Sequence, residues 1–260
     1  MLSRMSSRMS SWMSSGTSRG LEILRWAGIA AAVFVAGSVL SVLLFRWIDP
    51  PVTPLMLIRL AEGAVHWRWV GIHQRSVPLD QVSPELLRAV IAAEDAHFFT
   101  HWGVDMDALR KARAWNARHE RQGRVRGAST ITMQCARNVF LWQGRTYVRK
   151  ALELWFTALM EAMWSKGRIL EVYVNVIEWG PGVYGAQAAA ERYFHVPAAR
   201  LDARQAALLA AALPNPLARN PADPTPFLDA RASRIARRAA LVRLRGVVRS
   251  TPRKRLAATR

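Results

Sequence analysis

The sequence predicts a mainly α-helical domain preceded by a single N-terminal transmembrane helix. From residue 84 onward, apolar side chains recur at three- and four-residue spacing, which is typical of helices that bury one face. No run of alternating, strand-like residues interrupts this pattern. No charged residue occurs between Trp26 and Phe45. Because about 20 apolar residues span the hydrocarbon core of a bilayer, this segment is expected to cross a membrane.

Length and charge limit the classes of protein that the chain can belong to. Its 260 residues suit one sizeable domain with appendages, and the net charge of +19 predicts attraction to a polyanion. Nucleic acid, an anionic bilayer and a phosphate-bearing substrate all fit that charge. Cys135 is the only cysteine, so neither an intrachain disulfide nor a cysteine-built metal site is expected.

The N-terminal third divides into a basic tail, a membrane anchor and a proline-rich spacer. The apolar run is longer than the roughly 7–15 residues of a signal peptide, which predicts an uncleaved anchor. Positive residues before the span outnumber the one acid, Glu22, so the tail is expected to be cytoplasmic and everything after residue 50 to lie outside the cytoplasm. Residues 1–20 show no apolar periodicity and are expected to be disordered in water. The predicted segments are a tail at 1–25, a transmembrane helix at 26–48, a catalytic domain at 49–247 and a basic C-terminal tail at 248–260.

The domain is expected to consist of helices joined by short loops. A short helix is predicted within 55–69, and further helices at 84–96, 105–121, 130–140, 147–165, 167–177, 183–194, 202–213 and 229–247. The basic end of the chain, from Arg231, is interpreted as a last domain helix with a disordered end; a basic amphipathic helix on anionic lipid is the alternative.

Glu94 is the first candidate for chemistry. Ser83 and Pro84 are typical of a helix start, and the apolar residues that follow place Glu94 on the buried face at the helix's C-terminal end. Desolvation and the negative end of the helix dipole both disfavour the ionised carboxylate, so its pKa is expected to rise toward the range useful for proton transfer. An amphipathic helix with Glu94 turned to solvent is the simpler alternative.

The segment GRVRGASTITMQCARNVFLW, residues 123–142, predicts an anion-binding site. Its glycines allow a close backbone approach, Ser129 or Thr130 can cap the next helix, and the free N–H groups of that helix suit an anion. Several cationic side chains nearby favour a diphosphate over a single carboxylate; they are Arg124, Arg126, Arg137, Arg145, Arg149 and Lys150. A capped helix with solvated arginines explains the same residues without a ligand.

Glu153 is the second candidate carboxylate. It lies one turn after Arg149, so the two could form a surface pair, but the helix is apolar enough to bury Glu153, which would then need a partner or a task. Asp95 and His101 are expected to order the loop after Glu94 through hydrogen bonds rather than to hold zinc. A divalent cation, Mg²⁺ or Mn²⁺, near Glu94 and a substrate diphosphate is left open, and no cofactor is required.

Several ordered motifs resemble those of the peptidoglycan glycosyltransferases, the glycan-polymerising family also found as a module in bifunctional penicillin-binding proteins. They are EDAHFFTHWG (94–103), GASTITMQCARN (127–138), RKALE (149–153), KGRILEVYVN (166–175) and GPGVYGAQAAAERYF (180–194). The chain resembles the monofunctional biosynthetic form, since it has neither the Ser-x-x-Lys nor the Lys-Thr-Gly of a transpeptidase.

This resemblance implies a lysozyme-like, mainly α domain that polymerises lipid II into glycan strands. It assigns Glu94 as the general base for the 4-hydroxyl of the acceptor GlcNAc, with attack on the donor's MurNAc C1, inversion and release of undecaprenyl diphosphate. Glu153 supports the donor site. By the same resemblance the leaving diphosphate is stabilised by Arg137 and Arg145, and the donor side is lined by Ser129, Thr130, Gln134 and Asn138, with Arg149 and Lys150 beside it.

One residue departs from the family pattern, because Arg137 stands where the motif usually has Lys, so equal efficiency is not assumed. The alternatives to a polymerase are a lysozyme-like hydrolase or lytic transglycosylase, and a non-catalytic membrane-anchored scaffold. The expected partners are lipid II, the nascent glycan strand, membrane lipids and other cell-wall synthesis proteins, with no nucleic acid. The expected location is the bacterial inner membrane, single-pass, with the catalytic domain periplasmic.

Overall fold

The computed structural model describes residues 2–65, 71–119, 126–144 and 146–245, with side chains from residue 21 onward. The chain forms two compact units, residues 1–45 and residues 46–260. The first unit is helix α1 (Leu2–Phe45), of which Leu21–Phe45 is long and apolar enough to cross a membrane. Residues 2–20 are helical, whereas the sequence predicted disorder for residues 1–20. The reason is that a helix that continues from an existing turn needs no new nucleus.

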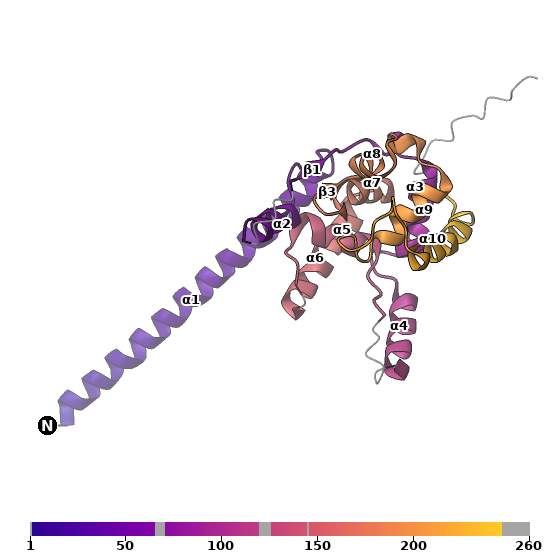
Figure 1. The fold of residues 1–260 in the computed structure, drawn as a ribbon. Coiled ribbons are helices and arrows are strands. Elements are labelled where there is room, and N and C mark those ends of the chain that lie inside the picture. Colours follow the sequence, from indigo (N-terminus) through magenta and orange to yellow (C-terminus); the bar gives the residue numbers. More distant parts are fainter. Residues whose placement is uncertain (1, 66–70, 120–125, 145, 246–260) are drawn as a thin grey trace, which may run out of the picture. The chain divides into compact units, whose positions relative to one another are not determined.

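The second unit is built mainly from helices, shown with their labels in Figure 1. Three of them, α3, α9 and α10, pack against one another, and a second group forms where α5 packs on α6 and α7. The α-helices of this unit are α2 (Pro54–Val65), α3 (Pro84–Glu94), α4 (Met106–His119), α5 (Ile131–Phe140), α6 (Tyr147–Met163), α7 (Lys166–Val176), α8 (Ala186–Phe194), α9 (Ala203–Ala212) and α10 (Pro226–Ala239), with short 3₁₀ helices η1 (Leu79–Gln81) and η3 (Ala198–Arg200).

Side-chain caps fix the starts of the helices that carry the site. The hydroxyl of Ser83 accepts the N–H of Glu85 at the start of α3, and Thr130 and Thr146 cap α5 and α6 in the same way. Each cap satisfies a backbone donor that the helix leaves free, a contribution of typically about 1 kcal/mol. Helix α7 is buried along almost its whole length and forms part of the domain core.

The structure corrects three sequence predictions. A small sheet is present, with strands β1 (His73–Gln74), β2 (Glu178–Gly180) and β3 (Val183–Tyr184) in the order β1-β3-β2; β1 pairs parallel and β2 antiparallel to β3. Strands of two or three residues are too short to show alternation. Helix α8 therefore begins at Ala186, after Gly185 (φ +89°), and not at 183. Helix α10 begins at Pro226, three residues before the predicted start, and ends at Ala239 instead of 247.

Candidate active site

Glu94 is the last residue of α3 and faces α5 and α7. The side-chain amide of Gln134 on α5 donates to Oε2 of Glu94 at 2.8 Å. The hydroxyl of Tyr173 on α7 donates in turn to Oε1 of the same glutamine at 3.1 Å. Three helices thus meet in one hydrogen-bonded chain that ends on the carboxylate of Glu94.

Burial is the main influence on the pKa of the Glu94 carboxylate. It raises the pKa of Glu94, while the hydrogen bond from Gln134 and the positive charges of Arg231 and Arg137 act in the opposite direction. The raised pKa has the direction and the main cause predicted from the helical spacing. A carboxylate whose pKa is raised is a stronger base once it is ionised, which suits it to accept a proton from a substrate.

Asp95 points into a different set of contacts from its neighbour Glu94. Its buried carboxylate accepts from Nε2 of His101 at 2.9 and 3.0 Å and from the backbone N–H of Ile131 at 3.0 Å. These bonds tie the end of α3 both to the following loop and to the start of α5. They support the proposed loop-ordering role of Asp95 and His101.

The sequence predicted that the first turn of α5 would have free N–H groups for an anion, but side chains of the protein bind two of them. Asp95 takes the N–H of Ile131, and the hydroxyl of Thr130 takes the N–H of Met133 at 3.2 Å. The same hydroxyl donates to the carbonyl of Gly103. An internal carboxylate therefore occupies part of the position that the sequence suggested for a substrate diphosphate. Ser129, just before this cap, is half-buried.

The later residues of α5 line a cavity of about 220 Å³, which we call the amide pocket. Hydrogen-bonding groups come from Gln134, Asn138, Gln143 and Tyr173, and charged groups from Arg59, Arg137 and Glu178. Apolar walls come from Leu55, Ile177, Leu213, Pro214 and Pro216. The Nε of Arg137 is buried and has no hydrogen-bond partner among the described residues. An unpaired donor in a polar cavity is suited to a ligand oxygen.

Glu153 on α6 is almost completely buried and is held by two cations. Arg149, one turn earlier, donates to Oε2, and the Nζ of Lys150 lies 2.7 Å from Oε1. Arg149 is itself buried, so the simpler interpretation of a surface pair does not describe this contact. The pairing supports a role for Glu153 in holding α6 together beside the site. Arg145, the other predicted diphosphate ligand, lies outside the described residues, as does Arg124.

Sequence reasoning missed two buried carboxylates next to these elements. Glu161 on α6 accepts from Thr132 at 2.6 Å and from Lys166 at 2.7 Å, and Lys166 also donates to the carbonyl of His101. Glu178 in β2 pairs with Arg59 on α2 at 2.9 Å, across 119 positions of the chain. No local pattern marks either residue, because Thr132 lies 29 positions from Glu161 and Arg59 lies 119 positions from Glu178.

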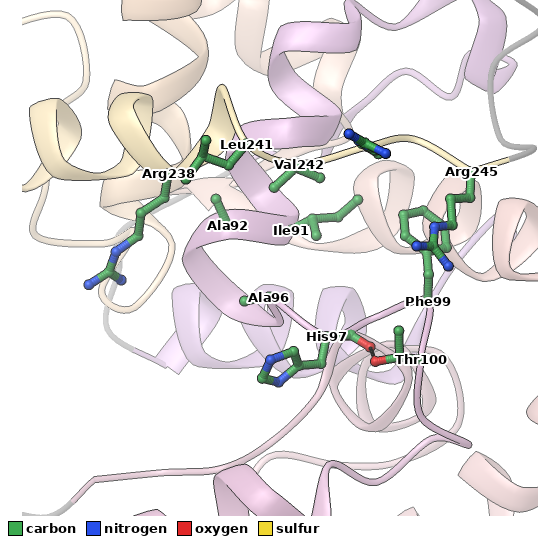
Figure 2. Close-up of a pocket in the computed structure, with 11 residues that line it drawn as sticks. Ile91, Ala92, Ala96, His97, Phe99, Thr100, Arg238, Leu241, Val242 and Arg245 are labelled. Atoms are coloured by element: carbon green, nitrogen blue, oxygen red, sulfur yellow. Dashed lines mark hydrogen bonds between the residues drawn. The ribbon is translucent and has the colours of Figure 1, made fainter.

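A larger cavity of about 450 Å³ lies beside the C-terminal end of α3 (Figure 2). Its floor includes Ile91, Ala92 and Val242, while Arg238 and Arg245 lie at opposite sides of it. Residues after the end of α10 form part of the wall of this cavity. The sequence instead predicted that the helix would continue to residue 247. Three arginines, Arg238, Arg243 and Arg245, line this cavity together with apolar side chains, a combination that suits an amphiphilic anion.

A metal site built from protein side chains has little support in the described part of the chain. Within residues 21–65, 71–119, 126–144 and 146–245, no three His, Cys, Asp or Glu residues gather in a way that could hold an ion. His97, which the sequence places near the candidate metal ligands, instead contacts Asp105 at 2.8 Å.

Comparisons with known proteins find a matching family model and several similar relatives. The family model described as "Transglycosylase" matches residues 64–240. A biosynthetic peptidoglycan transglycosylase of Rhodospirillum centenum is 53% identical over 220 residues, which are 84% of this chain and 92% of the relative. Proteins of the same name from Caulobacter vibrioides and Pseudomonas putida are 51% and 49% identical, each over 83% of this chain and 90% of the relative.

Proposed function

The chain belongs to the transglycosylase family and is a peptidoglycan glycosyltransferase, and from this premise we propose that it extends glycan strands from lipid II with Glu94 as the general base. The observation that carries the assignment of Glu94 is the chain of hydrogen bonds from Tyr173 through Gln134 to a carboxylate with a raised pKa. Such a carboxylate is oriented, and its raised pKa makes it a better proton acceptor when it is ionised.

In the proposed reaction Glu94 removes the proton from the 4-hydroxyl of the acceptor GlcNAc. The freed oxygen attacks C1 of the MurNAc at the end of the growing strand, and a new C1–O4 bond forms with inversion. The bond from C1 to the diphosphate oxygen breaks, and its electron pair leaves with undecaprenyl diphosphate. Atoms and charge balance, because the proton stays on Glu94 until water removes it.

Departure of the diphosphate requires positive charge at fixed positions. Arg137 is suited to this role, since its buried Nε has no hydrogen-bond partner in the part of the chain that the structure describes, and its charge lies near Glu94. Arg145, Lys150 and Asn138 are proposed to assist. Ser129 and Thr130 are proposed to line the donor side, with Thr130 acting mainly through the cap of α5. If Mg²⁺ or Mn²⁺ takes part, it would neutralise charge on the diphosphate.

The membrane anchor fits this substrate. Leu21–Phe45 suits a single-pass anchor, and we propose that the N-terminus is cytoplasmic and the catalytic unit periplasmic in the bacterial inner membrane. Lipid II and the nascent strand would then meet the enzyme at the membrane surface, beside membrane lipids and other cell-wall synthesis proteins. A hydrolase or lytic enzyme gains nothing from the cationic Arg137, which favours synthesis.

The test is incubation of full-length protein with labelled lipid II in detergent, with and without Mg²⁺ or Mn²⁺, followed by product sizing and lysozyme digestion. We expect lysozyme-sensitive polymer from the wild type and none from Glu94→Gln. The matched control is Glu85→Gln on the same helix, because the side chain of Glu85 is 40% exposed and pairs with Arg88. Cleavage of preformed glycan without polymer would contradict the proposal.

A further inference from the structure

The amide pocket receives a side chain from outside the region that the family model matches. That match begins at residue 64, near the end of α2, whereas Arg59 lies earlier on the same helix. Helix α2 packs on α5, and its buried Leu55 also lines the pocket. The family model therefore assigns no role to Arg59.

Two carboxylates hold the guanidinium of Arg59 in one orientation. Its Nε lies 2.9 Å from Oε2 of Glu178, and its Nη1 lies 2.7 Å from Oε2 of Glu62. These contacts leave Nη2 for a further acceptor. The side chain of Arg59 is 29% exposed, so part of it remains accessible beside the pocket.

Glu178 is itself fixed by the small sheet. Its side chain is only 5% exposed, and Oε1 accepts from the backbone N–H of Gly182 at 3.3 Å and from the hydroxyl of Tyr184 at 3.5 Å. A buried carboxylate with neutral donors still requires a cation, which Arg59 supplies. The pair therefore joins α2 to the strands at a fixed distance and angle.

The lining of the pocket indicates what Arg59 would contact. Two carboxylates already balance the charge of Arg59, so Arg59 itself favours a neutral sugar over a phosphate, whereas Arg137, which lines the same pocket, is the cation proposed for the diphosphate. Amide and hydroxyl groups from Asn138, Gln143 and Tyr173 line the pocket together with two prolines, a combination that suits the hydroxyls and C–H faces of a sugar. At about 220 Å³ the pocket is smaller than the roughly 300–1,000 Å³ typical of drug-sized ligands, so it fits one sugar residue.

We propose that Arg59, held by Glu178, is a substrate-positioning residue that binds one sugar residue of the donor strand in the amide pocket. This role rests on the proposed polymerase function. In the reaction, Arg59 takes no proton and stabilises no leaving group; it fixes the donor sugar so that its C1 faces the acceptor oxygen. Loss of the contact is expected to raise the KM for lipid II and to leave the acid limb of the pH profile unchanged.

The test compares Arg59→Met with Arg75→Met in the full-length protein. Arg75 forms a similar long-range pair, 2.7 Å from Glu191, but does not line the pocket. We expect Arg59→Met to raise the KM about tenfold, the effect of one charge-assisted hydrogen bond, with kcat within about threefold. Arg75→Met is expected to match the wild type. Equal KM values for the two variants would overturn the proposal.

Binding without turnover separates this proposal from the function on which it rests. The probes are muramidase-released GlcNAc–MurNAc peptides and inorganic pyrophosphate, each titrated by calorimetry. Arg59→Met is expected to weaken binding of the glycan fragments about tenfold and to leave pyrophosphate binding unchanged. An equal loss for both probes would indicate a general charge effect and refute a sugar contact. Failure of the wild type to polymerise lipid II would refute the function, yet these titrations would still report on the pocket.

Two further variants guard against misfolding, because Arg59→Met leaves Glu178 buried without a cation. Arg59→Lys keeps a charge for Glu178 but loses the planar fork, so it is expected to fold and still raise the KM. The double variant Arg59→Met/Glu178→Gln removes both charges and is expected to recover thermal stability without recovering the KM. Wild-type KM in either variant would overturn the proposal.

Discussion

Replacing Gln134 by Met tests whether the hydrogen bond to Glu94 sets the working pH range of the enzyme. The amide of Gln134 lies 2.8 Å from Glu94 and lowers the pKa of that carboxyl against the larger effect of burial. Its loss is therefore expected to raise the pKa further. A general base works in its ionised form, so the acid limb of the pH–kcat profile is expected to move to higher pH.

The size of the effect follows from the kind of bond that is removed. A hydrogen bond to a charged group contributes about 1.5–3 kcal/mol, which corresponds to roughly a tenfold to hundredfold loss of rate on the acid side of the profile. On the alkaline side, where Glu94 is ionised in both proteins, the two rates are expected to converge. The measurement is initial rate of lipid II polymerisation across a pH series.

A second variant separates catalysis from stability. In Gln134→Met the hydroxyl of Tyr173 loses its acceptor inside the core, at a cost of about 1–3 kcal/mol in the free energy of unfolding. Adding Tyr173→Phe removes that unpaired group, so stability is expected to recover while the acid limb stays displaced. The control is Gln187→Met, because Gln187 also donates to a carboxylate, Glu191, at 2.6 Å, away from the site. An acid limb that does not move, or that returns in the double variant, would refute the reasoning.

Three other substitutions test the buried carboxylates by urea denaturation. Burial raises the pKa of Glu94 in the folded state above its value in the unfolded state. The protonated form of Glu94, which the fold favours, is therefore lost as the pH rises through the folded-state pKa. Glu94→Gln is expected to stabilise the fold, more at pH 8 than at pH 5. Asp95→Ala removes the acceptor for His101 and Ile131 and is expected to cost about 3–5 kcal/mol. Glu153→Met leaves Arg149 buried without its partner and is expected to cost a similar amount, mostly recovered when Arg149→Met is added.

Exposed carboxylates on the same or neighbouring helices provide the controls for these measurements. Glu85→Gln on α3 removes a partly exposed ion pair and Asp107→Ala on α4 a largely exposed one, and each is expected to change the free energy of unfolding by less than about 1 kcal/mol. If Glu94→Gln destabilised the fold at pH 8, burial would not be the main influence on that carboxylate. If Asp95→Ala lowered the free energy of unfolding no more than Asp107→Ala does, the hydrogen bonds from Asp95 to the loop and to α5 would not stabilise the fold.

Local sequence patterns were sufficient to predict the helices that carry the site. Both the start and the end of each of these helices, α3, α5, α6 and α7, were predicted to within two residues. The reason is that caps and apolar periodicity are local properties. The same periodicity placed Glu94 on the buried face of its helix. A helical pattern, however, gives the direction of a side chain and not its partner, so the contact of Glu94 with Gln134 did not follow from it.

Contacts between distant segments account for what the sequence did not predict. Arg59 and Glu178 lie 119 positions apart, and neither belongs to a pattern that predicts burial of a charge. Tyr173 falls within a recognised motif, KGRILEVYVN, but nothing in that motif marks its hydroxyl as the donor to Gln134. The three short strands were not predicted, because a strand of two or three residues is too short to show an alternating pattern.

The occupied terminus of α5 has a consequence for the leaving group. Since Asp95 and Thr130 bind backbone N–H groups of the first turn, we expect stabilisation of the diphosphate to depend more on side-chain cations than the glycine-rich loop suggested. Among the described residues, Arg137 is the cation that combines a place in the amide pocket with a buried, unpaired Nε. A lysine at this position would offer a single ammonium group, whereas the guanidinium presents a planar fork to two oxygens at once. The arginine that departs from the family pattern thus fits a site in which backbone donors are already taken.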